Sequence, residues 1–181
     1  MILETCQILY AAHWINTTDP KWDFTICSYE PYKKTHVNHP SCIWARSHSS
    51  HYDWLIKLGL ELCKEYTRRY SKDHKCYTHL LRLQKMGFPV SKVVKEHKID
   101  RRKMAQIEIP KGTEYFLCAI NDELFDKCAV YKDGKLAGVS TYRNYYTYKE
   151  WELKWERNAT DAPLWYTNLL AKRNVIDLTN E

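Results

Sequence analysis

The stretch that most constrains the fold is residues 39–75, because it holds the longest run with the periodicity of a helix. Pro40 suits the first turn, where no backbone N–H is needed. The serine-rich residues 47–50 weaken the helix, so the pattern is compatible with one helix or with two helices joined there. Apolar or aromatic residues recur every three or four positions and form one stripe: Trp44, Tyr52, Leu55, Leu58, Leu62, Tyr66 and Tyr70.

Residues 1–16 are predicted to form a helix that is apolar nearly all round, and such a helix lies at the centre of a fold rather than at its edge. Glu4 is its only charged residue. A carboxylate on a buried helix must be paired or have a raised pKa, which makes Glu4 the best candidate for a catalytic acid or base. The alternative is a surface glutamate in the first turn, where the helix dipole favours it.

The remaining chain predicts shorter elements. Residues 76–87 read as a helix that ends at Gly87 in a left-handed conformation, and residues 107–110 read as extended. An Asp-Gly pair predicts a small hairpin over residues 129–138, and a further helix is expected over residues 139–157. We therefore expect a mainly α fold, a compact helical bundle with a small β-hairpin. It would form a single domain over residues 1–181, with a polar C-terminal tail at about 172–181 that frays.

The composition favours a nucleic-acid partner without proving one. The net charge is +6, and 14 Tyr and 7 Trp accompany only 5 Gly. Aromatic side chains among Lys and Arg suit base stacking and phosphate contact, but aromatics also build the core of a small protein. The basic residues of segment 91–111 leave the same two alternatives, nucleic-acid contact or a solvated face.

Seven cysteines without a CxxC pair argue against a disulfide framework and indicate reduced thiols in a cytosolic protein. The sequence shows no signal peptide and no membrane-spanning run. Histidine and cysteine recur within residues 36–51 without a standard zinc spacing, so we expect no metal and no cofactor. The cysteines lie in apolar runs, which favours inert core thiols over nucleophiles. Phosphate-binding loops and GxSxG elbows are absent from the sequence.

Chemistry on DNA needs a carboxylate, cations that hold phosphates and aromatics that support an unstacked base. The chain supplies each type. The candidates are Glu4 as the catalytic residue and, for nucleic-acid binding, His39, Arg46, Arg69, His74, Lys75, Tyr142, Arg143, Tyr145 and Trp165.

Several sequence blocks carry a resemblance to a known group of proteins. They are residues 1–9, 39–47, 52–55, 65–75, 142–146, 154–155 and 163–166. These blocks resemble a family of uncharacterised bacteriophage proteins, which is in turn similar to the pyrimidine-dimer DNA glycosylases of the T4 endonuclease V type. The resemblance implies a small all-α fold, a helix glutamate at Glu4 as acid or base, an N-terminal α-amine as nucleophile, and no metal.

The chain departs from this pattern at its beginning, because the relatives carry a further stretch before the first helix. We therefore expect base-release chemistry without the imine-forming lyase step. The expected function is that of a phage DNA-binding protein, DNA glycosylase-like, acting on damaged or modified pyrimidines in the host cytoplasm. Arg46, Arg69, His74 and Arg143 would hold phosphates, while Trp44, Tyr145 or Trp165 would line a base pocket.

Two other classes of function remain open. One is a non-enzymatic factor that binds DNA or a host protein, for example in counter-defence. The other is an enzyme that acts on free nucleotides. A concave pocket around Glu4 would favour a glycosylase, a flat basic face would favour a binding protein, and a narrow closed pocket would favour free nucleotides.

Overall fold

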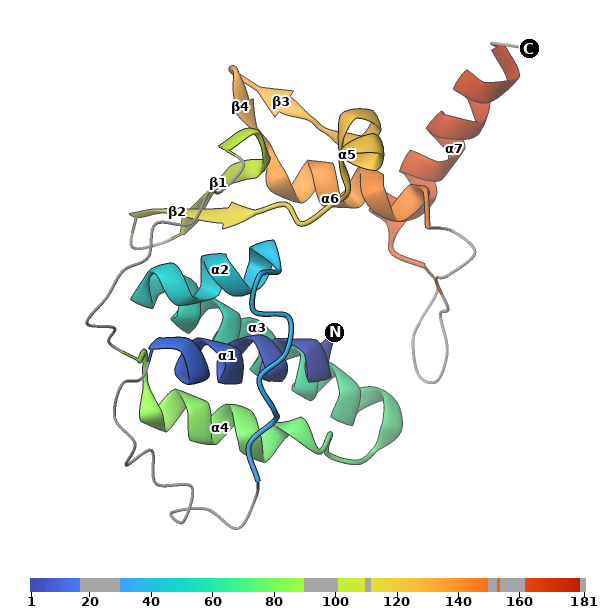
Figure 1. The fold of residues 1–181 in the computed structure, drawn as a ribbon. Coiled ribbons are helices and arrows are strands. Elements are labelled where there is room, and N and C mark those ends of the chain that lie inside the picture. Colours follow the sequence, from blue (N-terminus) through green and yellow to red (C-terminus); the bar gives the residue numbers. More distant parts are fainter. Residues whose placement is uncertain (17–29, 90–100, 110–111, 150–152, 154–161, 180–181) are drawn as a thin grey trace. The chain divides into compact units, whose positions relative to one another are not determined.

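The computed structural model describes residues 1–16, 30–89, 101–109, 112–149, 153 and 162–179. The chain divides into two compact units, residues 1–99 and residues 100–181, and each is described by itself (Figure 1). The described residues are mainly helical, with seven α-helices and two short two-stranded sheets, which confirms the predicted fold class. The expectation of one domain over residues 1–181 stays a prediction.

Unit 1 is a helical bundle built around α1. Its helices are α1 (Ile2–Asn16), α2 (Pro40–Ser47), α3 (Ser49–Tyr70) and α4 (Cys76–Met86). Figure 1 shows α1 between α2 and α4, and α1 also contacts α3. The central position predicted for residues 1–16 is confirmed, although Leu3 and Trp14 on this helix remain exposed.

The helical stretch predicted over residues 40–71 is divided into two helices at His48, whose backbone is extended. Three helices of unit 1 begin next to a histidine whose Nδ1 accepts a backbone N–H two residues later. The pairs are His39 with Ser41 and His48 with Ser50, both at 3.2 Å, and His74 with Cys76 at 3.1 Å. Such contacts satisfy N–H groups that have no partner within the helix, and they require an unprotonated Nδ1.

Close packing of three helices depends on a glycine in the middle of α3. A Cβ added at Gly59 would lie 2.8 Å from Cδ2 of Leu80 on α4 and 3.0 Å from Cγ2 of Thr5 on α1. A side chain at this position would require Leu80 or Thr5 to shift.

Unit 2 combines strands and helices in the order β1 (Met104–Ile109), β2 (Gly112–Leu117), α5 (Asp122–Cys128), β3 (Tyr131–Lys132), β4 (Lys135–Leu136), α6 (Gly138–Thr147) and α7 (Leu164–Thr179). Strands β1 and β2 are antiparallel, with Met104 opposite Leu117 and Ile109 opposite Gly112. Extended structure near residue 107 is confirmed, but β2 and α5 are elements that the sequence pattern did not predict.

Helix α6 begins as predicted and ends at Thr147, while residues 150–152 and 154–157 of the predicted helix lie outside the described residues. Helix α7 continues to Thr179, so the predicted tail at 172–181 is helical over its described part. Its fraying stays a prediction. Residues 90–100, which contain the first part of the basic segment 91–111, also lie outside the described residues.

Both glycine turns adopt positive φ, but only one has the predicted conformation. Asp133 and Gly134, with φ of 50° and 72°, form the turn between β3 and β4, as expected for a two-residue hairpin loop. Gly87 follows α4 with φ 72° and ψ −172°, so the prediction of a left-handed helical cap is wrong there. Its backbone lies in a region that is essentially restricted to glycine.

Candidate functional site

Glu4 lies in the first turn of α1, and its side chain is 74% exposed. Its Oε2 atom is 3.4 Å from the α-nitrogen of Met1. The expectation that this carboxylate is buried is therefore wrong, since the buried positions of α1 begin at Thr5 and Cys6. Glu4 lies instead where the alternative interpretation expected it, as a surface glutamate in the first turn that the helix dipole favours. A role in acid–base chemistry stays a prediction.

His74 shares this end of unit 1 with Glu4. Burial, followed by the positive charge of the Met1 α-amino group, lowers the pKa of His74. The same amine pairs with Glu4. The His74 ring meets Tyr66 edge-on at 4.8 Å between centroids, and Tyr66 stacks on Tyr70 at 4.5 Å. A carboxylate, an imidazole and stacked phenol rings are thus gathered around the beginning of α1 and the end of α3.

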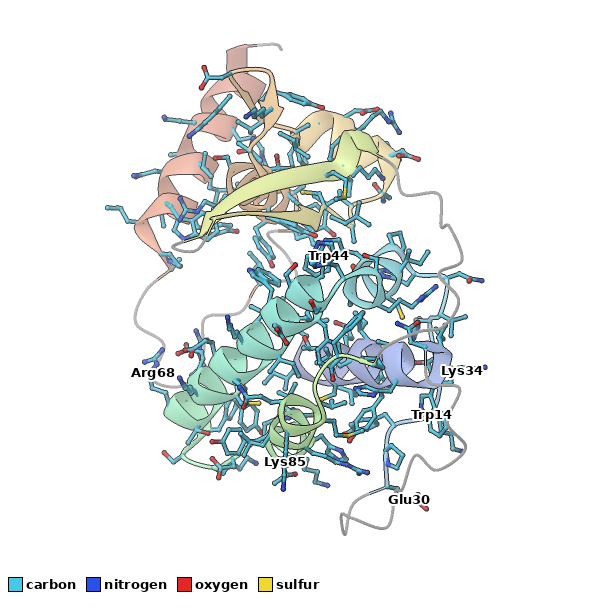
Figure 2. All side chains as sticks on the ribbon, turned by 90° about the vertical axis from the view of Figure 1, so that its left-hand side faces the viewer. Trp14, Glu30, Lys34, Trp44, Arg68 and Lys85 are labelled. Atoms are coloured by element: carbon cyan, nitrogen blue, oxygen red, sulfur yellow. The ribbon has the colours of Figure 1, made fainter. Side chains whose placement is uncertain are left out.

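The last turns of α3 add positive charge at the same end. Residues 64–75 contain five cations, Lys64, Arg68, Arg69, Lys72 and Lys75, against two carboxylates. Figure 2 shows Arg68 projecting from this part of α3. We call Glu4, His74 and residues 64–75 together the Glu4 end of unit 1.

One carboxylate holds two of these guanidinium groups in place. Glu65 accepts hydrogen bonds from Nε of Arg68 at 2.7 Å and from Nε of Arg69 at 2.6 Å. These bonds lower the pKa of Glu65 to about 2, so the group stays ionised in neutral solution. Arg69 is half-buried, whereas Arg68 and Lys75 are exposed. The arrangement leaves excess positive charge on the surface, as contact with a polyanion requires.

Arg46 lies elsewhere, at the opposite end of α1. It is 6% exposed, and its guanidinium donates to the carbonyl of Val37 and to Sγ of Cys42 at 3.4 Å. The Asn16 amide at the end of α1 donates to the Arg46 carbonyl at 3.0 Å. The twelve helical steps from Glu4 to Asn16 span about 18 Å. Arg46 therefore does not share a surface with the cations of the Glu4 end, and phosphate contact by Arg46 stays an untested prediction.

The junction of α2 and α3 contains two further candidates. Trp44 is 4% exposed and stacks on His51 at 4.4 Å between ring centroids (Figure 2). It therefore serves the packing of this junction, and its assignment to a base pocket is not supported. His39 is exposed and caps α2 through its Nδ1.

The remaining four candidates gather in unit 2, on α6 and α7. The Arg143 guanidinium carbon lies 5.1 Å from the ring centroid of Trp165, and Nζ of Lys149 lies 5.4 Å from that of Tyr145. The Tyr142 hydroxyl accepts the N–H of Ala119 at 3.0 Å, and burial raises the pKa of this phenol to about 12. We call the following residues the aromatic–cationic cluster: Tyr142, Arg143, Tyr145, Tyr146, Lys149 and Trp165.

The sequence reading missed Tyr146 and Lys149 of this cluster. Tyr146 lies four residues after Tyr142 on the same face of α6, whereas Lys149 lies in the turn after Thr147. In the helix predicted over residues 139–157, spacings of four and seven residues place both on the face of Tyr142, so the signal was present.

Buried tyrosine–histidine pairs form a second group that the sequence did not reveal. Tyr10 and His79 share a hydrogen bond of 2.9 Å, and Nε2 of His13 lies 2.7 Å from the Tyr52 hydroxyl. Because that hydroxyl donates to the carbonyl of Leu83, it accepts from a protonated Nε2 of His13. Burial and then the charge of Arg82 lower the pKa of His13 to about 4. These pairs hold α1, α3 and α4 together.

The cysteines and metal ligands give no additional site in the described part of the chain. The six described cysteines are buried and free, and burial raises the pKa of Cys63 to about 11 and that of Cys118 to about 12. Within those residues, no group of three or more His, Cys, Asp or Glu side chains could hold a metal ion. No described helix is long and apolar enough to cross a membrane.

Comparison with known proteins identifies one similarity. The family model described as pyrimidine dimer DNA glycosylase matches residues 1–78, somewhat less than half of the 181 residues. The matched part contains α1, α2, α3 and the start of α4, and hence Glu4 and His74, whereas unit 2 lies outside it. The chain matches no curated protein. It also matches no solved structure.

Proposed function

We propose that the protein is a DNA glycosylase-like protein that acts on damaged or modified pyrimidines in DNA, with Glu4 as the acid or base. The observation that carries this proposal is the similarity of residues 1–78 to the pyrimidine dimer DNA glycosylase family. The expectation from the sequence blocks, a phage protein in the host cytoplasm, belongs to the same proposal.

The geometry of the Glu4 end supports contact with duplex DNA. The exposed carboxylate is open to a bulky partner, and the surplus of cations over residues 64–75 attracts phosphates. Each phosphate that a cation neutralises adds roughly one unit to the slope of log affinity against log salt. We expect steep loss of duplex binding between low and physiological salt, measured by fluorescence anisotropy. A slope near zero would contradict the proposal.

The proposed reaction is hydrolysis of the glycosylic bond. The bond between C1′ of the sugar and the pyrimidine nitrogen breaks, and its electron pair leaves with the base. The oxygen of a water molecule bonds to C1′, and the Glu4 carboxylate accepts a proton from that water. A positioned general base typically contributes on the order of 10²–10⁴-fold in rate.

The test is base release from ultraviolet-irradiated duplexes and from duplexes with modified pyrimidines, detected as alkali-labile abasic sites. Glu4→Gln keeps the shape of the side chain without a group that exchanges a proton near neutral pH, so it should lose at least about 100-fold in rate. Glu61→Gln is the matched control, because Glu61 is also an exposed glutamate paired with a cation three residues away. Activity that survives Glu4→Gln would exclude Glu4 as the acid or base.

A specific observation favours a second candidate, a protein that binds DNA without releasing a base. Glu4 is exposed to solvent rather than enclosed together with a base. This candidate predicts salt-dependent binding, no abasic sites with any duplex, and equal affinity for wild type and Glu4→Gln. Pull-down of a host protein independent of DNA would instead support the protein-binding alternative.

A further inference from the structure

Unit 2 carries an interaction surface that the similarity to glycosylases does not cover. Half-exposed aromatic rings follow one another along α6 and onto α7, at 6.0 Å between the centroids of Tyr145 and Tyr146 and 6.5 Å between those of Tyr146 and Trp165. Arg143, which is exposed, lies over the Trp165 ring. Its planar guanidinium offers both a positive charge and a flat face on which a base can stack.

The charge of α6 and of the first ten residues of α7 has one sign, and Asp177 lies further along α7. Residues 138–149 and 162–173 contain Arg143, Lys149, Lys172 and Arg173 but no Asp or Glu. Helix α5 of the same unit contrasts with them, since it contains Asp122, Glu123 and Asp126. Cations and aromatic rings are therefore concentrated on α6 and α7, which complements a polyanion with accessible π-faces.

The packing of α6 against α7 holds this surface in shape. The Arg173 guanidinium on α7 donates to the carbonyl of Thr147 at the end of α6 and lies 5.3 Å from the ring centroid of Tyr148. Tyr166, at the start of α7, is buried and places the neighbouring Trp165 beside α6. Binding to such a surface orders few additional protein side chains, which reduces the entropic cost of association.

We propose that the aromatic–cationic cluster of unit 2 binds single-stranded DNA by stacking unpaired bases on its rings. In duplex DNA the π-faces are covered by neighbouring base pairs, so the rings of this cluster gain a partner only where bases are unpaired. The inference goes beyond the proposed function, because it concerns residues outside the matched segment and does not require base release.

The test measures binding of the full chain to fluorescein-labelled oligodeoxythymidine by anisotropy. Trp165→Ala and Arg143→Gln should each weaken binding roughly tenfold, as expected for loss of one stacking contact. Lys135→Gln is the matched control, because Lys135 is an exposed cation of the β3–β4 hairpin in the same unit; it should change affinity less than twofold. Tyr145→Phe, which retains the ring, should bind like wild type, while Tyr145→Leu should weaken binding.

The result that would overturn the proposal is equal affinity for oligodeoxythymidine and for a blunt duplex of the same length, or equal loss in Lys135→Gln and Trp165→Ala. Either would mean that charge rather than stacking governs the contact. The melting temperature of each variant shows whether it is folded. If Trp165→Ala does not fold, the comparison of Tyr145→Phe with Tyr145→Leu still tests the proposal. Glu4→Gln should bind the oligonucleotide like wild type, so failure of the glycosylase proposal leaves this result unchanged.

Discussion

The buried tyrosines Tyr10 and Tyr52 of unit 1 and the aromatic–cationic cluster of unit 2 use the same residue types for opposite purposes. In unit 1, Tyr10 and Tyr52 are 0% exposed, and their hydroxyls bond to His79 and His13 inside the helical bundle. In unit 2, Tyr145 and Trp165 are half-exposed and lie beneath Lys149 and Arg143. The high tyrosine content of the chain therefore reflects both buried core residues and residues at the surface.

The difference shows that the group each aromatic ring contacts, rather than the number of aromatic residues, distinguishes a core ring from a surface ring. A buried hydroxyl needs a hydrogen-bond partner, and imidazole nitrogens and backbone carbonyls supply it inside unit 1. A ring near the surface can lie against a cation whose charge remains in contact with water. The following predictions test this contrast, beginning with the largest expected effect.

Matched tyrosine-to-alanine substitutions should separate the units most clearly. Tyr10→Ala empties a fully buried position and should lower the free energy of unfolding by about 3–5 kcal/mol, as for other large aromatic core residues. Tyr145→Ala removes a half-exposed ring and should cost about 1 kcal/mol or less. Urea denaturation measures both values. Equal losses would show that the α6 ring belongs to a core.

Acid should destabilise unit 1 through its buried histidine. The folded-state pKa of His13 is about 4, below its ordinary value of 6.5, so the unfolded chain binds the proton more readily. The stabilisation is present above pH 6.5 and is lost as the pH falls toward 4, an effect of about 3 kcal/mol. Urea denaturation at pH 7 and pH 4 measures this loss. His13→Gln should show a clearly shallower decline, and an identical decline in both proteins would contradict the assignment.

A single methyl group should disturb the close packing of α1, α3 and α4. Gly59→Ala places a Cβ 2.8 Å from Leu80, so we expect a loss of about 1–2 kcal/mol, even though alanine favours a helix. Thermal unfolding of a double-mutant cycle with Leu80→Ala gives the coupling between the two positions. The added methyl should cost less once the Leu80 side chain is removed, and purely additive losses would refute the proposed clash.

The smallest expected effect lies in the hairpin of unit 2. Gly134→Ala forces a residue with a Cβ into φ 72° and should cost about 1 kcal/mol. Nothing lies within 4 Å of the added Cβ, so the backbone conformation is the sole source of this cost. Gly134→Asn is the control, because asparagine tolerates this conformation better and should recover part of the stability. Measured stability equal to wild type in Gly134→Ala would contradict the turn conformation.

The periodic pattern of the sequence determined the helices of unit 1 and the hairpin turn. Helix α1, the pair α2 and α3, and the turn at Asp133 and Gly134 all follow from local rules, because apolar spacing and φ preferences act over a few residues. Strand β2 and helix α5 escaped prediction, since their stability depends on partners such as β1 and α6 rather than on strong local signals.

The composition and motifs of the chain identified the types of residue at the candidate sites, and only the tertiary structure decided where they lie. The sequence proposed both Glu4 and Arg46, yet α1 separates them, with Glu4 exposed at its beginning and Arg46 buried beyond its end. Burial and neighbouring groups depend on contacts between distant parts of the chain, such as that of the Asn16 amide with the Arg46 carbonyl. The spacing of residues along the sequence does not determine those contacts. It therefore identified the chemical groups available to this protein but not how they are arranged in space.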